Sequence, residues 1–286
     1  MKISDIYGKK KTVFSLEVFP PKKTDSVDAI YATLDGLKDI CPDFISVTYG
    51  AGGNVADVKT RSIAEIIKKE YNIESMAHLT CVSTSKEDAG LILEDFESHG
   101  IENILALRGD INPERPPKKD FCFASDLASY IKRKGYFDVG GACYPEGHTE
   151  AASIDEDIMN LKKKVDAGVS FLISQLFFDN DFFFSFFEKA KKAGIDVPVS
   201  AGIMPVTNKK QIERMVTMCG ASIPQDLAKI LSKYADDPDS LTDAGIEYAW
   251  RQIESLIKGG VRGIHLYTMN NPVIAIKIYR GIKELL

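Results

Sequence analysis

Residues 12–48, TVFSLEVFPPKKTDSVDAIYATLDGLKDICPDFISVT, contain one complete structural repeat. An apolar run at 12–18 leads into an amphipathic segment that ends near Ile40, and a second apolar run follows at 43–48. Short runs rich in β-branched and aromatic residues predict buried strands. A helical crossover between two such strands predicts a parallel βαβ unit. The repeat therefore indicates a parallel sheet covered by helices.

The same alternation continues along the chain. Apolar runs predict eight strands, at 12–18, 43–48, 75–81, 103–107, 138–143, 170–175, 197–203 and 263–267. Helical periodicity and capping residues predict a helix after each, opened by Thr24 or Asp25 and ending near 40, then at 58–70, 85–100, 125–134, 153–167, 180–193, 208–219 and 271–285. Eight strand–helix units predict an α/β fold, the (β/α)8 TIM barrel, with a doubly wound open sheet as the alternative.

Two further helical segments lie between the seventh and eighth predicted strands. They cover 224–234 and 241–258, and the turn-rich residues 235–239 separate them. We expect them to be extra helices packed on the barrel. Because the proline-rich stretches 19–21 and 113–117 directly follow predicted strands, neither is a linker. The prediction is one catalytic domain over residues 1–286.

Composition narrows the function classes. The 286 residues are 44% hydrophobic and 27% charged, which excludes a disordered chain and a collagen-like repeat. A net charge of −5 gives no overall footprint for nucleic acid, and no stretch approaches the roughly 18 apolar residues of a membrane span. The predicted partners are small molecules or proteins, with no nucleic acid and no membrane.

The five cysteines are odd in number and include no C-x-x-C pair, which disfavours a disulfide framework or a zinc ribbon. The N-terminal residues MKISDIYGKKKTV contain no apolar run of signal-peptide length. The expected location is therefore the cytoplasm.

Glu17 interrupts the first apolar strand. In a parallel barrel the active site forms at the C-terminal ends of the strands, where this carboxylate falls. Burial disfavours the charged form of a carboxyl group, so we expect a raised pKa, which suits a general acid. The alternative is a structural Glu paired with an Arg or Lys inside the barrel.

Other polar residues fall at the same end of predicted strands. The glycine-rich residues 50–54 could approach a ligand but lack the G-x-G-x-x-G pattern. His78 has no second residue at metal-ligand spacing, so no metal is expected, and a buried core histidine is the alternative to a ligand-binding one. Arg108 and Asp110 follow the fourth strand, and these two could simply form a salt bridge.

The predicted helix 153–167 carries Asp157, Asn160, Lys163 and Lys164 on one face. An acceptor, an amide and two cations could hold a ribose and a diphosphate. The alternative is an ordinary solvated helix face.

Taken together, several motifs resemble the methylenetetrahydrofolate reductase family, in its bacterial form with a catalytic domain only. They are 14–21 (FSLEVFPP), 47–50 (VTYG), 78–81 (HLTC), 107–110 (LRGD), 144–146 (YPE), 164–168 (KVDAG) and 202–205 (GIMP). The resemblance implies a cytoplasmic flavoenzyme of one-carbon metabolism and methionine biosynthesis. Such an enzyme reduces 5,10-methylenetetrahydrofolate to 5-methyltetrahydrofolate with a hydride from NAD(P)H that passes through N5 of FAD.

The resemblance also assigns roles to residues. It makes Glu17 the general acid and Asp110 a second catalytic residue near both flavin and pterin, where its negative charge tunes the flavin. The positions implied to bind FAD are Thr48, His78, Leu107, Arg108, Gly109, Asp110, Phe123, Ala124, Tyr144, His148, Asp157, Asn160, Lys163 and Lys164. The positions implied to bind folate are Glu17, Asp110, Gln175, Gln211, Tyr267 and Asn271.

Three positions depart from the family pattern. Phe123 stands where many bacterial relatives have Tyr, Met215 where an aromatic residue is frequent, and Asn271 where some relatives have Arg. The departures at Met215 and Asn271 affect positions that the resemblance links to the electron donor and to the glutamate tail of the folate. We therefore consider a second hypothesis, in which the chain is the catalytic subunit of a reductase complex and receives electrons from an iron–sulfur partner.

Two further alternatives come from other classes. A pterin-binding methyltransferase barrel would not need the helix face at 157–164. A Schiff-base aldolase would need a lysine near the end of a strand, and no predicted strand has one. The resemblance also implies a homo-oligomer.

Overall fold

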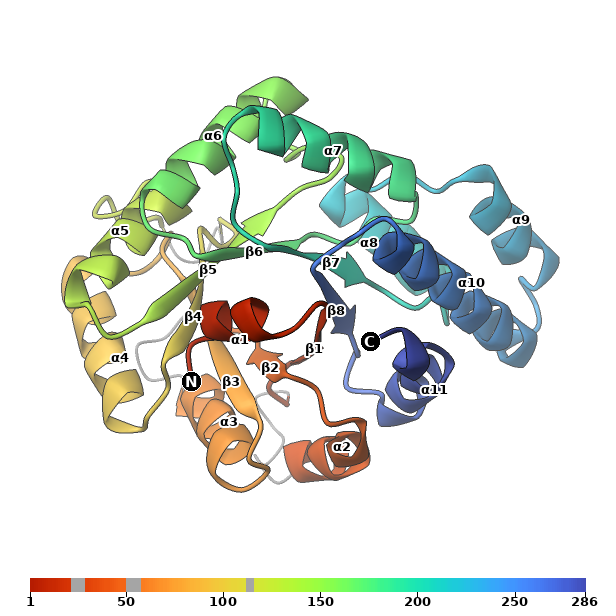
Figure 1. Ribbon diagram of the computed structural model, residues 1–286, viewed down its shortest axis with the longest axis horizontal. Helices are drawn as coiled ribbons and strands as arrows, with labels where there is room; N and C mark the ends of the chain where they lie inside the picture. The colour runs from red at the N-terminus through yellow and green to blue at the C-terminus, as the bar shows by residue number, and fades with distance from the viewer. Residues whose placement is uncertain (22–28, 50–57, 112–115) are drawn as a thin grey trace.

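The computed structural model describes residues 1–21, 29–49, 58–111 and 116–286. Eight parallel strands pair in chain order and close into a barrel (Figure 1), which confirms the predicted (β/α)8 fold and excludes the open sheet. The strands are β1 (Val13–Val18), β2 (Phe44–Val47), β3 (Glu74–Thr80), β4 (Asn103–Leu107), β5 (Asp138–Cys143), β6 (Phe171–Ser174), β7 (Val199–Ile203) and β8 (Gly263–Tyr267). The barrel closes between β1 and β8, where Glu17 lies opposite Tyr267.

The helices surround the barrel. They are α2 (Ala29–Leu37), α3 (Val58–Lys69), α4 (Lys86–Ser98), α5 (Ala124–Lys134), α6 (Ile154–Asp166), α7 (Asn180–Lys192), α8 (Lys209–Cys219) and α11 (Pro272–Ile282), with short 3-10 turns η1 (Lys38–Ile40) and η2 (Lys283–Leu285). The predicted extra helices are present as α9 (Gln225–Lys233) and α10 (Pro238–Lys258). The predicted start of α2, the glycine-rich residues 50–54 and residues 113–115 lie outside the described residues.

Capping explains where two helices begin. Ser85 accepts a hydrogen bond from the backbone N–H of Asp88, whose carboxylate accepts from the N–H of Ser85, so α4 starts as predicted. By contrast, α10 starts at Pro238, inside the segment expected to be a turn. Asp237 caps this helix by accepting from the N–H of Ser240, and a proline is well suited to the first helical position.

Helix α1 (Ile3–Lys9) was not predicted, and it closes the N-terminal end of the barrel, as Figure 1 shows. The hydroxyl of Tyr7 lies 2.7 Å from that of Ser200 on β7, and the N–H of Ile3 donates to Asn103 on β4. The α-amino group of Met1 forms ion pairs with Glu74 and Glu102 at 2.6 and 2.5 Å. The helix is short and has no side-chain cap, so only these tertiary contacts reveal its place.

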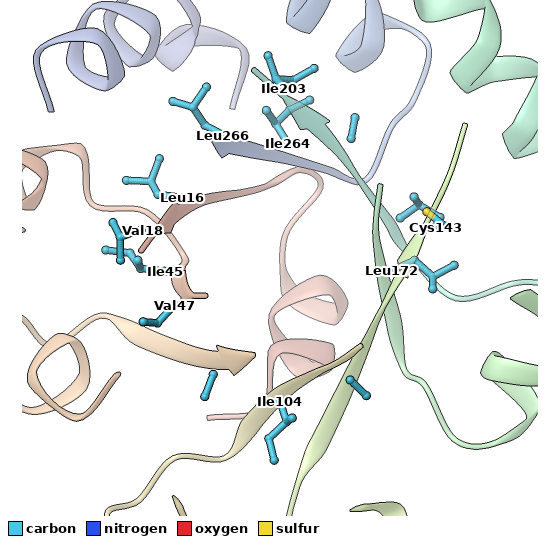
Figure 2. Close-up of a cluster of buried hydrophobic side chains, with 14 of the residues drawn as sticks. Leu16, Val18, Ile45, Val47, Ile104, Cys143, Leu172, Ile203, Ile264 and Leu266 are labelled. Carbon is cyan, nitrogen blue, oxygen red and sulfur yellow. The ribbon is translucent and has the colours of Figure 1, made fainter. Parts of the chain in front are cut away.

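Strand alternation separates an outer apolar layer from an interior that holds both polar and apolar side chains. Leu16, Ile45 and Ile264 belong to the outer layer, between the strands and the helices (Figure 2). Their neighbours along the strands include the buried Ser15, Ser46 and His265, which point into the barrel. The interior therefore presents hydrogen-bonding groups directly beneath the C-terminal end of the strands. Within the described residues, no helix is both long and apolar enough to cross a membrane.

Candidate active site

A cavity of about 740 Å³ lies at the C-terminal end of the barrel; we call it the first cavity. Residues on β1, β3, β4, β5, β6 and β8, or just after the ends of β2 and β7, contribute to its wall. Of the residues implied to bind ligands, it is lined by Glu17, Thr48, His78, Leu107, Arg108, Gly109, Asp110, Tyr144, His148, Gln175 and Tyr267. The barrel thus brings together groups that are widely separated in the sequence.

A second cavity of about 480 Å³ lies between the ends of β4 and β5 and helices α5 and α6. Its wall includes the remaining residues implied to bind FAD, namely Phe123, Ala124, Asp157, Asn160, Lys163 and Lys164. The two cavities share the wall residues Leu107, Arg108, Ala142, Tyr144 and His148. They therefore adjoin.

Glu17 lies inside the first cavity and is surrounded by histidines rather than by Arg or Lys. The hydroxyl of Ser46 donates to its Oε2 at 3.3 Å. The Nε2 atoms of His78 and His265 each lie 3.5 Å from the same oxygen. Among the described residues, no Arg or Lys pairs with Glu17; the basic groups within ion-pair distance are these two histidines, so the alternative of an Arg or Lys partner finds no support.

The expectation of a raised pKa for Glu17 is also wrong. Burial raises the pKa of the carboxyl group, but the hydrogen bond from His265 and the histidine charges outweigh it, and the pKa falls below its usual value. Burial lowers the pKa of His78 to about 4, against the opposing attraction of Glu17, so His78 is neutral at pH 7. The hydrogen bonds from His265 and Ser46 therefore help to keep Glu17 ionised at neutral pH.

His78 is buried, as a core histidine would be, yet it also faces the cavity. Only 6% of the residue is exposed, and its Nε2 has no hydrogen-bond partner among the described residues. A buried polar atom without a partner costs free energy unless another group satisfies it. The ring therefore suits a ligand that exchanges a hydrogen bond with Nε2.

Arg108 does not pair with Asp110, the alternative considered from the sequence. Its guanidinium forms a two-point ion pair with Glu150, with Nη2 2.7 Å from Oε1 and Nη1 in contact with Oε2.

The next residue, Gly109, has a φ of +81°, and a Cβ there would lie 2.9 Å from the Cβ of Thr80. Glycine at this position lets the chain turn sharply along the cavity wall.

The four residues expected on one face of α6 all line the second cavity. Asp157 accepts a hydrogen bond from the N–H of His148 at 3.2 Å, and burial raises its pKa. The ammonium of Lys164 donates to the carbonyl of Ala142 at 2.6 Å, and burial lowers its pKa. Lys163 donates to Asn160 at 3.0 Å. Two cations, a carboxyl and an amide thus face one cavity.

Two residues implied to bind folate lie outside both cavity walls. Gln211 is in the first turn of α8, and the side chain of Asn271 caps α11 by accepting from the N–H of Ile274. Met204, Met215 and Met269 instead line the first cavity. His265 and Glu150 received no role from the sequence. The alternation along β8 could have revealed His265, which lies two positions before Tyr267 on the inward face.

An eight-stranded barrel with polar groups converging at the C-terminal ends of its strands defines a (β/α)8-barrel enzyme. The family model described as methylenetetrahydrofolate reductase matches residues 2–283. This chain belongs to the methylenetetrahydrofolate reductase family, which confirms the resemblance and the enzyme class.

Individual relatives agree. A 5,10-methylenetetrahydrofolate reductase of Pectobacterium carotovorum is 37% identical over 264 residues, covering 92% of this chain and 88% of the relative. The Escherichia coli enzyme is 36% identical with the same coverage. The "Methylenetetrahydrofolate reductase (NADH) 1" of Arabidopsis thaliana is 36% identical over 98% of this chain, which spans 50% of that relative.

A solved structure shares the fold at lower sequence identity. It is a Clostridium thermocellum protein described as binding two copies of 5-methyl-5,6,7,8-tetrahydrofolic acid. The TM-score is 0.67 at 14% identity, covering 98% of this chain and 97% of that one. This likeness supports the barrel architecture.

Proposed function

We propose that this chain reduces 5,10-methylenetetrahydrofolate to 5-methyltetrahydrofolate, using FAD and NAD(P)H. The observation that carries the proposal is the pair of adjoining cavities, one around Glu17 and one with cations on its wall. Bound FAD would supply the hydride-transfer chemistry, through N5, between NAD(P)H and the one-carbon unit of the folate.

The residues present fit a dinucleotide with one half in each cavity. Lys163, Lys164 and Arg108 offer positive charge for a diphosphate, and Asp157 and Asn160 offer polar groups for a ribose. In the first cavity, the unpartnered Nε2 of His78 suits a polar edge of the ring system. Thr48, Leu107, Gly109, Tyr144 and His148 would complete this wall, and Phe123 and Ala124 that of the second cavity.

Glu17 would act as the general acid. A proton passes from its carboxyl group to N10 of the folate, the bond between the methylene carbon and N10 breaks, and the electron pair remains on N10. In the open cavity this carboxyl is ionised, so it must first be protonated. A ligand that displaces water from the cavity strengthens the effect of burial, which favours the protonated form.

Other wall residues would hold the folate. The carboxylate of Asp110 lies in the wall of the first cavity. It would disfavour negative charge on a flavin ring bound beside it. The Oε1 of Gln175 accepts from the N–H of Leu176 at 2.8 Å, which leaves its amide N–H groups for the pterin. The hydroxyl of Tyr267 donates to the carbonyl of Ser174 at 2.7 Å and so presents its ring to the cavity. Gln211 and Asn271 would need ligand-induced movement to take part.

An absorbance experiment tests the proposal. The purified chain is loaded with FAD, and NADH and then methylenetetrahydrofolate are added anaerobically to the same cuvette. Flavin bands that bleach with NADH and return with folate are the expected result. Failure to bind FAD would contradict the proposal. If only dithionite bleaches the bands and folate restores them, the electrons come from another donor, as in the iron–sulfur partner hypothesis.

A further inference from the structure

The imidazole of His265 lies in the interior of the barrel, directly behind Glu17. The residue is fully buried, and its Nδ1 lies 2.8 Å from the hydroxyl oxygen of Ser15. On the other side of the ring, Nε2 lies 3.5 Å from both Glu17 Oε2 and Ser46 Oγ. The ring therefore links a buried hydroxyl on β1 to the carboxylate that faces the cavity.

Packing fixes the orientation of this ring. Its plane lies 24° from that of Phe44 with centroids 6.2 Å apart, and it is perpendicular to Tyr267 at 5.3 Å. Because the ring is held on both sides, its two nitrogen atoms cannot exchange places without repacking the core. The hydrogen bond at Nδ1 then determines which nitrogen carries the proton.

When the His265 ring carries a single proton, Ser15 selects one of its two tautomers next to an ionised Glu17. When the Ser15 hydroxyl donates to Nδ1, the proton of the neutral ring is on Nε2 and points toward Glu17 and Ser46. When the hydroxyl instead donates to the carbonyl of Ile264, 3.3 Å away, Nδ1 carries the proton. The Nε2 lone pair would then face a carboxylate, which is repulsive.

The surrounding groups leave Glu17 as the charge that His265 meets at neutral pH. His78 on β3 has a pKa of about 4 and is neutral. Burial raises the pKa of Tyr267 on β8 well above its usual value, so that side chain is neutral too. Strand β2 presents the uncharged Ser46 and Phe44, and β7 places Gly202 opposite His265.

We propose that Ser15 and His265 form a positioning pair that directs an Nε2–H at Glu17, orients its carboxylate toward the cavity and sets the pH range in which it donates a proton. The inference rests on the proposed role of Glu17 as general acid. The pair touches neither the one-carbon unit nor any other reacting atom, so it acts through Glu17 alone.

The test compares Ser15→Ala, His265→Phe and His265→Gln with the control Ser75→Ala. Ser75 is also a fully buried strand serine, and its hydroxyl has no hydrogen-bond partner among the described residues. His265→Phe keeps a ring of similar size but loses both nitrogens. His265→Gln restores a donor that can reach toward Glu17. Ser15→Ala removes only one oxygen atom, so it still tests the proposal if His265→Phe does not fold.

The first readout is independent of activity. The chain has four histidines, so 15N-histidine NMR spectra of the folded wild type can be assigned by single substitutions. The proposal expects a proton on Nε2 of His265 and an Nδ1 that accepts from Ser15, and a changed distribution of the proton between the two nitrogens in Ser15→Ala. A proton on Nδ1 in the wild type, or spectra of Ser15→Ala that match those of Ser75→Ala, would overturn it.

The second readout is the pH profile of folate reduction, measured apart from flavin reduction by NADH. His265→Phe removes the Nε2 donor and Ser15→Ala makes it less populated. Both changes weaken an interaction that opposes the effect of burial on Glu17, so activity in both variants should persist to higher pH. The ratio of the folate-reduction rate at neutral pH to that at low pH should be several-fold higher in Ser15→Ala and His265→Phe than in the wild type. In His265→Gln this ratio should return part of the way to the wild-type value. Flavin reduction should stay within about twofold of wild type.

The two proposals fail differently. If the wild type bleaches and never reoxidises with folate, the proposed function is wrong, whereas the NMR result still decides the tautomer. If the wild type reduces folate and all variants keep its pH profile, the positioning pair is wrong and the proposed function stands.

Discussion

The guanidinium of Arg108 is held in a two-point ion pair by Glu150 at the junction of the two cavities. Both side chains are partly exposed, at 27% and 57%. Exposed ion pairs of this kind contribute roughly 0.2–1 kcal/mol, because water screens them. Under the proposed function, Arg108 would therefore exchange Glu150 for the diphosphate of FAD at little cost.

Glu150→Gln should strengthen FAD binding by about two- to fivefold, since it frees Arg108 and removes a negative charge from a cavity expected to bind a diphosphate. Titration of the apoprotein with FAD, followed by quenching of flavin fluorescence, measures this change. The gain should shrink at high salt. Weaker binding would instead mean that Glu150 holds Arg108 in its binding position.

Glu17→Gln should lower the rate of folate reduction by about 10²- to 10⁴-fold, the usual contribution of a general acid, and leave flavin reduction by NADH nearly unchanged. Stopped-flow measurement of the two half-reactions separates these effects. Equal losses of rate in both half-reactions would show that Glu17 maintains the structure of the cavity and does not donate the proton.

Asp110→Asn should still bind FAD but shift its potential upward by on the order of 30 mV, which corresponds to ~1.4 kcal/mol for a two-electron couple. The reason is that a nearby negative charge disfavours a reduced, anionic ring. Spectroelectrochemistry measures the potential, and turnover of folate should change with it. Unchanged potential and kinetics would remove Asp110 from the mechanism.

His78→Gln should reduce the loss of stability on acidification. The pKa of His78 is about 4 in the folded protein and 6.5 when unperturbed, so the unfolded chain binds more protons between these values. The stabilisation is present above pH 6.5 and is lost as the pH falls toward 4, to a maximum of roughly 3 kcal/mol. Urea unfolding at several pH values measures it, and an unaltered slope in the variant would contradict the assignment.

Gly109→Ala should destabilise the protein more than Gly135→Ala. Both glycines have a φ of +81°, but an added Cβ would contact Thr80 at position 109 and meet nothing within 4 Å at position 135. The left-handed backbone costs about 1–2 kcal/mol at both positions, so the difference in thermal unfolding isolates the contact with Thr80. Equal shifts would mean that Thr80 moves aside freely.

The elements that local patterns specify were predictable from the sequence. Ser85 marks the start of α4, and the run containing Glu17 forms β1, because capping and strand alternation are local effects. The pKa of Glu17 was not predictable, since His78 and His265 reach it only through closure of the barrel. The partner of Arg108 was missed for a similar reason, because Glu150 comes from the loop after β5. Pairing between distant strands and loops leaves no periodic signal in the chain.

Helix α1, sealed against β3, β4 and β7 by Met1, Ile3 and Tyr7, closes one end of the barrel, so ligands reach Glu17 from the opposite end. A hydride donor and a folate that both bind in the first cavity must then enter it through the same opening, one after the other. Under the proposed function, the first product must leave before the second substrate enters. Because bound FAD would hold the reducing equivalents between the two binding events, this order predicts parallel lines in double-reciprocal plots of initial rate.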